Sequence, residues 1–146
     1  MIVVVDANII ISGIINPYGP IPEILLQNSR LDFIVPDYAL KEIALHKLRI
    51  CKETKTTVPV FDKLQENLLS GILVFSADTI NVADIEKAGK LTLSIDSKDT
   101  LYIAFCIGLD AMLWTGDLKL YKGLRRKGFR NIITTSELKD IIKGII

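Results

Sequence analysis

The chain of 146 residues is nearly neutral, with 18 Lys and Arg against 17 Asp and Glu and a net charge of +1. This balance excludes a globally basic surface for nucleic acids or anionic membranes, so any such surface must be local. Hydrophobic residues make up 49% of the sequence, enough for a substantial core. Two cysteines and one histidine exclude a disulfide framework and a histidine-rich metal site.

The chain begins with the apolar stretch MIVVVDANIIISG, which carries a carboxylate at Asp6. The stretch is too short for a transmembrane helix and lacks the basic start of a signal peptide, so we expect a cytoplasmic protein without a membrane segment. Residues 2–5 predict a fully buried strand. Because burying an unpaired carboxylate costs several kcal/mol, Asp6 must either end that strand or have a partner.

The rest of the chain alternates between helical and strand patterns. Turn residues at 16–22 lead into a helix that starts at Pro22, and residues 49–60 predict a loop or a helix extension. We expect further strands at 31–35, 72–75, 111–115 and 131–135, and further helices at 37–48, 61–70, 82–90, 97–108, 117–126 and the C-terminus. The alternation predicts a single α/β domain over residues 1–146, a three-layer α/β/α sandwich with a mainly parallel sheet and Rossmann-like topology.

Two aspartates follow predicted strands directly. Asp6 comes after the first strand, and Asp117 comes just after strand 111–115. In parallel sheets, ligands bind beyond the carboxyl ends of the strands where the strand order reverses, so both carboxylates are expected at one edge. Asp96 and Asp99 begin the helix before that strand. Each acid also has a local explanation, as a helix cap, a capping-box member or, for Asp6, an Asx-turn.

A shared cleft would change the chemistry of these acids. If Asp6, Asp99 and Asp117 met there, their charges would repel, and at least one would protonate unless a cation lay among them. Oxygen ligands without histidine or thiolate suit Mg²⁺ or Mn²⁺. A divalent ion held in this way polarises a phosphoryl oxygen and generates hydroxide, which are the requirements of phosphodiester hydrolysis.

The segments VVVDANIIISG, DSKDTLYIAF and LWTGD, in this order, resemble the PIN-domain ribonucleases over nearly the whole chain. The likeness is strongest to stand-alone prokaryotic members, many of which are toxins of toxin–antitoxin pairs (VapC-like). The resemblance implies a compact α/β/α fold and Mg²⁺- or Mn²⁺-dependent cleavage of single-stranded or structured RNA. It also implies an antitoxin protein as a partner and a homodimer.

The resemblance assigns roles residue by residue. Asp6, Asp99 and Asp117 match the first, third and fourth family carboxylates, which are catalytic and hold the metal. Asn8 and Thr115 match polar residues that support the site. Asp96, one helical turn before Asp99, is a candidate additional ligand.

The second family carboxylate matches Glu42 in VPDYALKEI, with Asp37 as the competing residue. An apolar stripe of Leu40, Ile43, Ala44 and Leu48 predicts the buried face of this helix, and its phase directs Glu42 away from the core. That position suits either an open cleft or plain solvent exposure. His46 shares a helix face with Glu42 and is expected at the surface.

The local basic signal follows Asp117. Lys119, Lys122 and Arg126 share one helical face, which is a candidate phosphate-binding strip or an ordinary solvated face. Trp114 and Tyr102 occupy core-like positions, so packing is favoured over base stacking.

Three functional classes follow from these residues. The favoured one is a metal-dependent endoribonuclease with catalytic residues Asp6, Glu42, Asp99 and Asp117. The second is a PIN scaffold that binds RNA or protein without cleavage. The third is another Mg²⁺-dependent phosphate-handling domain, a phosphatase or a receiver, although Asn8 and Ile10 stand where a DxDxT phosphatase needs Asp and a hydroxyl.

Overall fold

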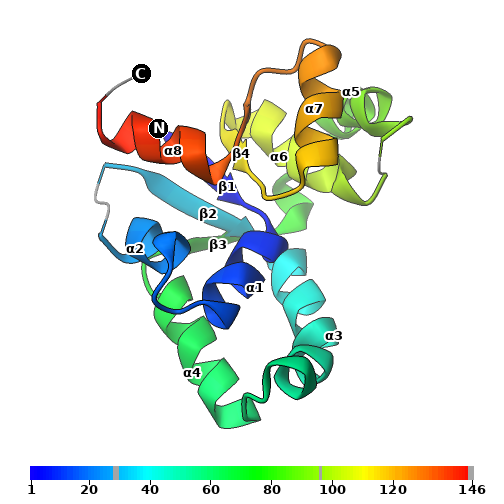
Figure 1. Ribbon diagram of the computed structural model, residues 1–146. Helices are drawn as coiled ribbons and strands as arrows, with labels where there is room; N and C mark the ends of the chain where they lie inside the picture. Colours follow the sequence, from blue (N-terminus) through cyan, green and yellow to red (C-terminus); the bar gives the residue numbers. More distant parts are fainter. Residues whose placement is uncertain (28–29, 96, 145–146) are drawn as a thin grey trace.

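The computed structural model describes residues 1–27, 30–95 and 97–144 (Figure 1). Within them, five parallel strands form one sheet in the order β3-β2-β1-β4-β5. The strands are β1 (Ile2–Val5), β2 (Asp32–Pro36), β3 (Leu73–Phe75), β4 (Met112–Trp114) and β5 (Ile132–Ile133). The predicted parallel sheet is confirmed, and the strand order reverses between β1 and β4.

Helices cover both faces of the sheet. They are α1 (Ala7–Ile15), α2 (Pro20–Gln27), α3 (Asp37–Thr54), α4 (Val58–Leu69), α5 (Val82–Thr92), α6 (Thr100–Leu109), α7 (Leu118–Arg126) and α8 (Thr135–Ile142), with short 3₁₀ turns η1 (Ala77–Thr79) and η2 (Ser97–Asp99). Figure 1 shows α1, α2 and α4 on one side of the sheet and α5 and α6 on the other. Right-handed crossovers require this arrangement. The chain runs outward from β1 through β2 to β3 and then returns to β4 on the other side of β1, so the helices before and after this return lie on opposite faces of the sheet.

Local patterns explain most element boundaries. Val3, Val4 and Val5 are fully buried, as expected for a central parallel strand that is covered on both faces. The polar stretch 49–60 contains both the end of α3 and a new helix, because the Thr57 side chain accepts the Val60 N–H and caps α4.

Two helix starts differ from the sequence pattern. Helix α2 starts at Pro20, whereas the sequence predicted a start at Pro22. Helix α1 was not predicted, because its residues show no amphipathic periodicity. In α1, Ile9, Ile10 and Ile14 are buried, because this helix packs against α2, α3 and α4. A helix with neighbours on several sides needs no polar stripe.

None of the described helices is by itself long and apolar enough to cross a bilayer. Helices α1 and α2 reach that length and composition only as a pair, and the pair is bent by 114°.

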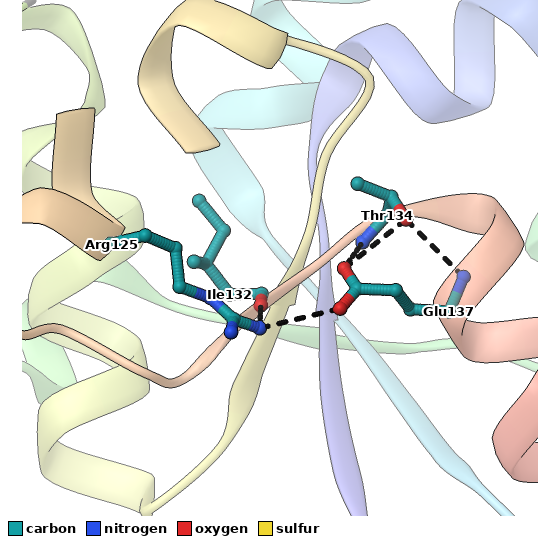
Figure 2. Close-up of polar contacts among 4 residues, drawn as sticks. All are labelled: Arg125, Ile132, Thr134 and Glu137. Carbon is teal, nitrogen blue, oxygen red and sulfur yellow. Dashed lines mark hydrogen bonds and ion pairs between the residues drawn. The ribbon is translucent and has the colours of Figure 1, made fainter. Parts of the chain in front are cut away.

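Arg125 connects α7 to the edge of the sheet (Figure 2). Its Nη2 atom donates to the Ile132 carbonyl oxygen over 3.1 Å and lies 3.5 Å from a Glu137 carboxylate oxygen. Glu137 in turn accepts the Thr134 N–H over 3.1 Å, and the Thr134 hydroxyl accepts the Glu137 N–H over 3.2 Å. Thr134 and Glu137 therefore form a capping box that starts α8.

Replacing Thr134 tests this capping box. We expect Thr134→Ala to lower the free energy of unfolding by about 1 kcal/mol, because the first turn of α8 loses its cap. Thermal unfolding should show a midpoint roughly 3 °C lower. Ser136→Ala, an exposed change in the same turn, is the matched control and should leave the midpoint unchanged. Equal midpoints for both variants would contradict the assigned role.

Candidate active site

Two carboxylates lie where the strand order reverses. Val5 of β1 is opposite Trp114 of β4, and the next residues along these strands are Asp6 and Thr115. Thr115 Oγ1 donates a hydrogen bond to Asp6 Oδ2 over 3.0 Å. Asp117 follows two residues later. The carboxyl ends of β1 and β4 thus bring these side chains to one point, where parallel α/β sheets bind their ligands.

Asp6 is buried and also hydrogen-bonded. Its side chain is 4% exposed, and besides Thr115 it accepts the Asn8 N–H at Oδ1 over 3.1 Å. Burial is the largest influence on this carboxyl and raises its pKa, and the negative charge of Asp117 raises it further. The hydrogen bonds from Asn8 and Thr115 oppose this rise without cancelling it. The protein therefore holds a carboxylate at a position where its charge is costly.

Asp117 is connected to Asp6 through Thr115. The Asp117 N–H donates to Thr115 Oγ1 over 3.1 Å, so one hydroxyl contacts both acidic residues. Asp117 Oδ1 accepts the Leu120 N–H over 3.0 Å and caps α7, while Asp6 caps α1. The local explanations are thus correct for both acids, an Asx-turn for Asp6 and a helix cap for Asp117. Because a carboxylate has about four acceptor positions, capping does not exclude metal binding.

Glu42 lies within electrostatic range of Asp6. It is half-buried on α3, and burial is the main cause that raises its pKa, followed by the charge of Asp6. The Tyr102 hydroxyl and the Lys98 charge both lower this pKa in part. Glu42 is therefore electrostatically coupled to Asp6 at the end of the sheet.

Asp99 reaches the same region from another helix. It occupies the N-cap position of α6, where its side chain makes no capping bond. The predicted capping box of Asp96 and Asp99 involves Asp96, which lies outside the described residues. Its charge acts on two tyrosines, the half-buried Tyr38 and the buried Tyr102. Burial first, and then the charges of Asp6, Glu42 and Asp99, raise the pKa of both Tyr38 and Tyr102. These three carboxylates thus act on one pair of tyrosines.

The buried face of α3 differs from the predicted stripe. Ile43 is buried, but Ala44 and Leu48 are exposed, and Ala39 is the buried residue one turn before Ile43. The inference that Glu42 points away from the core was therefore wrong. Glu42 follows Ala39 by three positions and so lies at the margin of the buried face, beside the end of the sheet.

Asp37 has a different partner. Its Oδ1 accepts the Ala77 N–H over 3.1 Å and so connects the start of α3 to η1. Its charge is not among the causes that raise the pKa of Asp6, Glu42 or the two tyrosines. Between the two candidates for the second carboxylate, the geometry favours Glu42.

The structure gives different outcomes for three further predicted residues, Asn8, His46 and Asp96. The bond from Asn8 to Asp6 comes from the backbone N–H, and the Asn8 side chain is exposed. His46 is exposed, as expected, and its Nδ1 lies 3.3 Å from an Arg49 guanidinium nitrogen. Asp96, the candidate additional ligand, lies outside the described residues.

Basic side chains of α7 border a surface pocket of about 330 Å³. Lys119 and Arg126 line it, but the third residue is Lys127 in place of the predicted Lys122, which is exposed outside the lining. Arg125 is directed instead to the sheet edge (Figure 2). The full lining is Ser94, Ile95, Lys119, Gly123, Arg126 and Lys127.

Gly123 allows α7 to approach the segment that leads to η2. A Cβ atom at this position would lie 2.7 Å from Ile95 Cδ1, which is too close for a real contact. The basic pocket therefore adjoins the segment that precedes Asp99, and Lys119 is two residues from Asp117. Positive charge thus borders the acidic region on one side.

The donor set is compatible with a hydrated Mg²⁺ or Mn²⁺. Among the described residues, no three Asp, Glu, His or Cys side chains form a ready-made metal cage. Mg²⁺ keeps several waters and uses only one or two carboxylates, so it does not require such a cage. The buried carboxylate of Asp6, with its raised pKa and oriented oxygens, is the kind of ligand whose charge a cation would compensate.

Comparison with known proteins identifies the family. A family model of the PIN domain matches residues 4–137, so the chain belongs to the PIN domain family. Among solved structures it is similar to a chain in the crystal structure of VapBC2 from Rickettsia felis bound to a DNA fragment from their promoter. The two are 20% identical, with a TM-score of 0.55 over 92% of this chain and 97% of that chain. No curated protein matches the chain.

Sequence reasoning correctly assigned Tyr102 and Trp114 to the core but missed the hydroxyl of Tyr102. Tyr102 is 1% exposed, and its Oη accepts the Ala7 N–H over 3.2 Å at the start of α1. The available signal was its spacing, because a residue three positions after Asp99 lies on the same side of the helix. A tyrosine there brings a polar group back toward the acidic residues.

Proposed function

We propose that this protein is a metal-dependent endoribonuclease that hydrolyses phosphodiester bonds in single-stranded or structured RNA. The observation that supports this most is the arrangement at the strand reversal. Asp6 and Asp117 are joined through one threonine there, and Asp6, Glu42 and Asp99 all act on the same two tyrosines. Membership of the PIN domain family supports the same activity.

The proposed roles follow from the hydrogen bonds. When bound, Mg²⁺ or Mn²⁺ would polarise a phosphoryl oxygen and lower the pKa of a water molecule to supply hydroxide. Asp6 is the central ligand, because Thr115 and the Asn8 N–H orient its two oxygens. Asp117 holds the second position, and Asp99 and Glu42 complete the set as ligands or as acceptors for metal-bound water.

The basic pocket gives the substrate a place beside these carboxylates. Lys119 is the second residue of α7, two positions after Asp117, and Arg126 is the last residue of that helix. The helix rises about 1.5 Å per residue, so the two cations are roughly 10 Å apart and reach different phosphates of one strand. We therefore assign Lys119 and Arg126, with Lys127, to the RNA backbone.

The double variant Lys119→Gln/Arg126→Gln tests this assignment. We expect RNA binding to weaken roughly tenfold at low salt, and the slope of log affinity against log salt to fall by about 1 to 2, because fewer phosphates are neutralised. Fluorescence anisotropy in EDTA measures binding without cleavage. Lys52→Gln on α3 is exposed and serves as the control. An unchanged salt slope in the double variant would remove these residues from the substrate path.

The cleavage assay tests the function itself. Labelled single-stranded RNA is incubated with the protein and Mn²⁺, with and without EDTA. We expect fragments only in the presence of the cation. Binding without fragments would support a silent scaffold, and phosphate release from a monoester, or labelling of Asp6 by a phosphodonor, would support another phosphate-handling domain.

We further propose an antitoxin as the protein partner, and a cytoplasmic homodimer as the assembly. The support for a protein partner is the likeness to a chain in the structure of VapBC2 from Rickettsia felis, and the homodimer rests on the family resemblance alone. Co-expression with the product of a neighbouring gene should yield a complex in which RNA cleavage is suppressed.

A further inference from the structure

The hydroxyl of Tyr102 joins elements that carry three of the proposed ligands. Tyr102 lies on α6, three residues after Asp99, and is 1% exposed. Its Oη accepts the N–H of Ala7 over 3.2 Å, and Ala7 directly follows Asp6. The same hydroxyl lies near enough to Glu42 on α3 to lower the pKa of that carboxyl. One phenol therefore connects the starts of α1 and α6 with the middle of α3.

The two contacts use the hydroxyl in complementary ways. The first N–H groups of a helix have no partner within the helix. At the start of α1, the Asp6 side chain accepts the Asn8 N–H, and Tyr102 accepts the N–H of Ala7. The single proton of the phenol is then available to a carboxylate, and Glu42 is a carboxylate whose pKa this hydroxyl lowers. A phenylalanine would keep the packing but satisfy neither group.

Tyr38 holds the ring of Tyr102 in place. The two ring centroids are 5.0 Å apart at an interplanar angle of 62°, an edge-to-face arrangement. Such pairs are stabilised by the ring quadrupoles. Because Tyr102 has so little freedom, the direction of its hydroxyl is fixed before any ligand arrives.

We infer that Tyr102 is a positioning residue for the cation site, which fixes the first turn of α1 beside Asp6 and orients the Glu42 carboxylate toward the same point. This inference rests on the proposed function. Hydrogen-bond partners of metal ligands typically contribute roughly tenfold or more to metal affinity. The contribution of Tyr102 should therefore be measurable as an affinity for the cation, without RNA cleavage.

The test is a double-variant comparison of Mn²⁺ affinity, measured by calorimetry or water-proton relaxation without RNA. Tyr102→Phe should weaken Mn²⁺ binding roughly tenfold. In a Glu42→Ala background, the same substitution should have a clearly smaller effect, because one of its two contacts is already gone. A structural role alone would give the same factor in both backgrounds and would overturn the inference. Tyr18→Phe, at a side chain that is 98% exposed, is the matched control.

A spectroscopic measurement keeps the inference testable if Tyr102→Phe fails to fold. The four tyrosines can be labelled with ¹³C at Cζ and assigned with Phe variants at the other three positions. Addition of Mg²⁺ should shift the Tyr102 resonance, and Glu42→Ala should reduce that shift. If Mg²⁺ shifts the Tyr38 resonance and leaves the Tyr102 resonance unchanged, the inference is overturned.

The outcomes separate this inference from the proposed function. If the wild-type protein neither binds Mn²⁺ nor cleaves RNA, both are wrong. If it does both and Tyr102→Phe matches it in affinity, the ribonuclease assignment stands and the role of Tyr102 is wrong.

Discussion

Asp6→Asn is expected to lower the rate of Mn²⁺-dependent RNA cleavage by about a thousandfold or more while the protein stays folded. Several kcal/mol of charge stabilisation depend on the cation, and each 1.4 kcal/mol corresponds to tenfold in rate. The amide keeps an oxygen that can accept the Asn8 N–H, so the cap of α1 survives. Single-turnover cleavage of labelled RNA measures the rate, and circular dichroism checks the fold. Asp99→Asn is expected to behave in the same way.

Asp32→Asn is the matched control for these variants. Asp32 is an exposed aspartate at the amino end of β2, so it lies at the opposite edge of the sheet. It should retain wild-type cleavage. If Asp6→Asn and Asp99→Asn both cleave as fast as Asp32→Asn, the assignment of these carboxylates to the reaction is wrong.

In the absence of divalent cations, we expect the protein to lose stability as the pH rises, through a contribution that belongs to Asp6. Its pKa is higher in the folded than in the unfolded protein, mainly through burial. The folded state therefore binds the proton more tightly, and this stabilisation is complete below the unfolded pKa of about 3.9 and is lost as the pH rises through the folded pKa. Chemical unfolding in EDTA at several pH values measures the free energy.

The Asp6→Asn variant isolates that contribution from those of other groups. At pH 7 in EDTA it should be more stable than the wild type by roughly 1–2 kcal/mol, because a buried and incompletely compensated charge is removed. The difference should shrink as the pH falls through the raised pKa of Asp6, because the protonated carboxyl carries no charge. Mn²⁺ should stabilise the wild type, by about 2.7 kcal/mol at one hundred times its dissociation constant, and the variant far less. A pH-independent difference would contradict the burial argument.

The expected effects of Asp6 on cleavage and on stability have one physical cause. A carboxylate buried among valines and isoleucines destabilises the empty protein at neutral pH, and the same burial strengthens its attraction to a cation. Thr115 and the Asn8 N–H reduce the cost but do not remove it. The protein therefore gives up some stability at the position where the proposed chemistry needs a ligand.

The sequence by itself determined the α/β class and the position of the site along the chain. Each strand is a short apolar run, and the segment after it has helical periodicity. Strands that alternate with helices in this way are expected to pair in parallel. Because side chains after parallel strands lie at one edge, Asp6 and Asp117 could be placed together without coordinates. The hydrogen bonds that join both residues to Thr115 confirm that they lie close together.

Only the tertiary structure decided the rest. Helix α1 has apolar residues on several faces because three helices surround it, so periodicity could not reveal it. The face of α3 that is buried depends on its neighbours, and the apolar residues Leu45 and Leu48 proved to be 81% and 73% exposed. Glu42 could therefore not be oriented from its own helix. The contact of Tyr102 with Ala7 crosses 95 residues of sequence, and no local pattern encodes a partner at that separation.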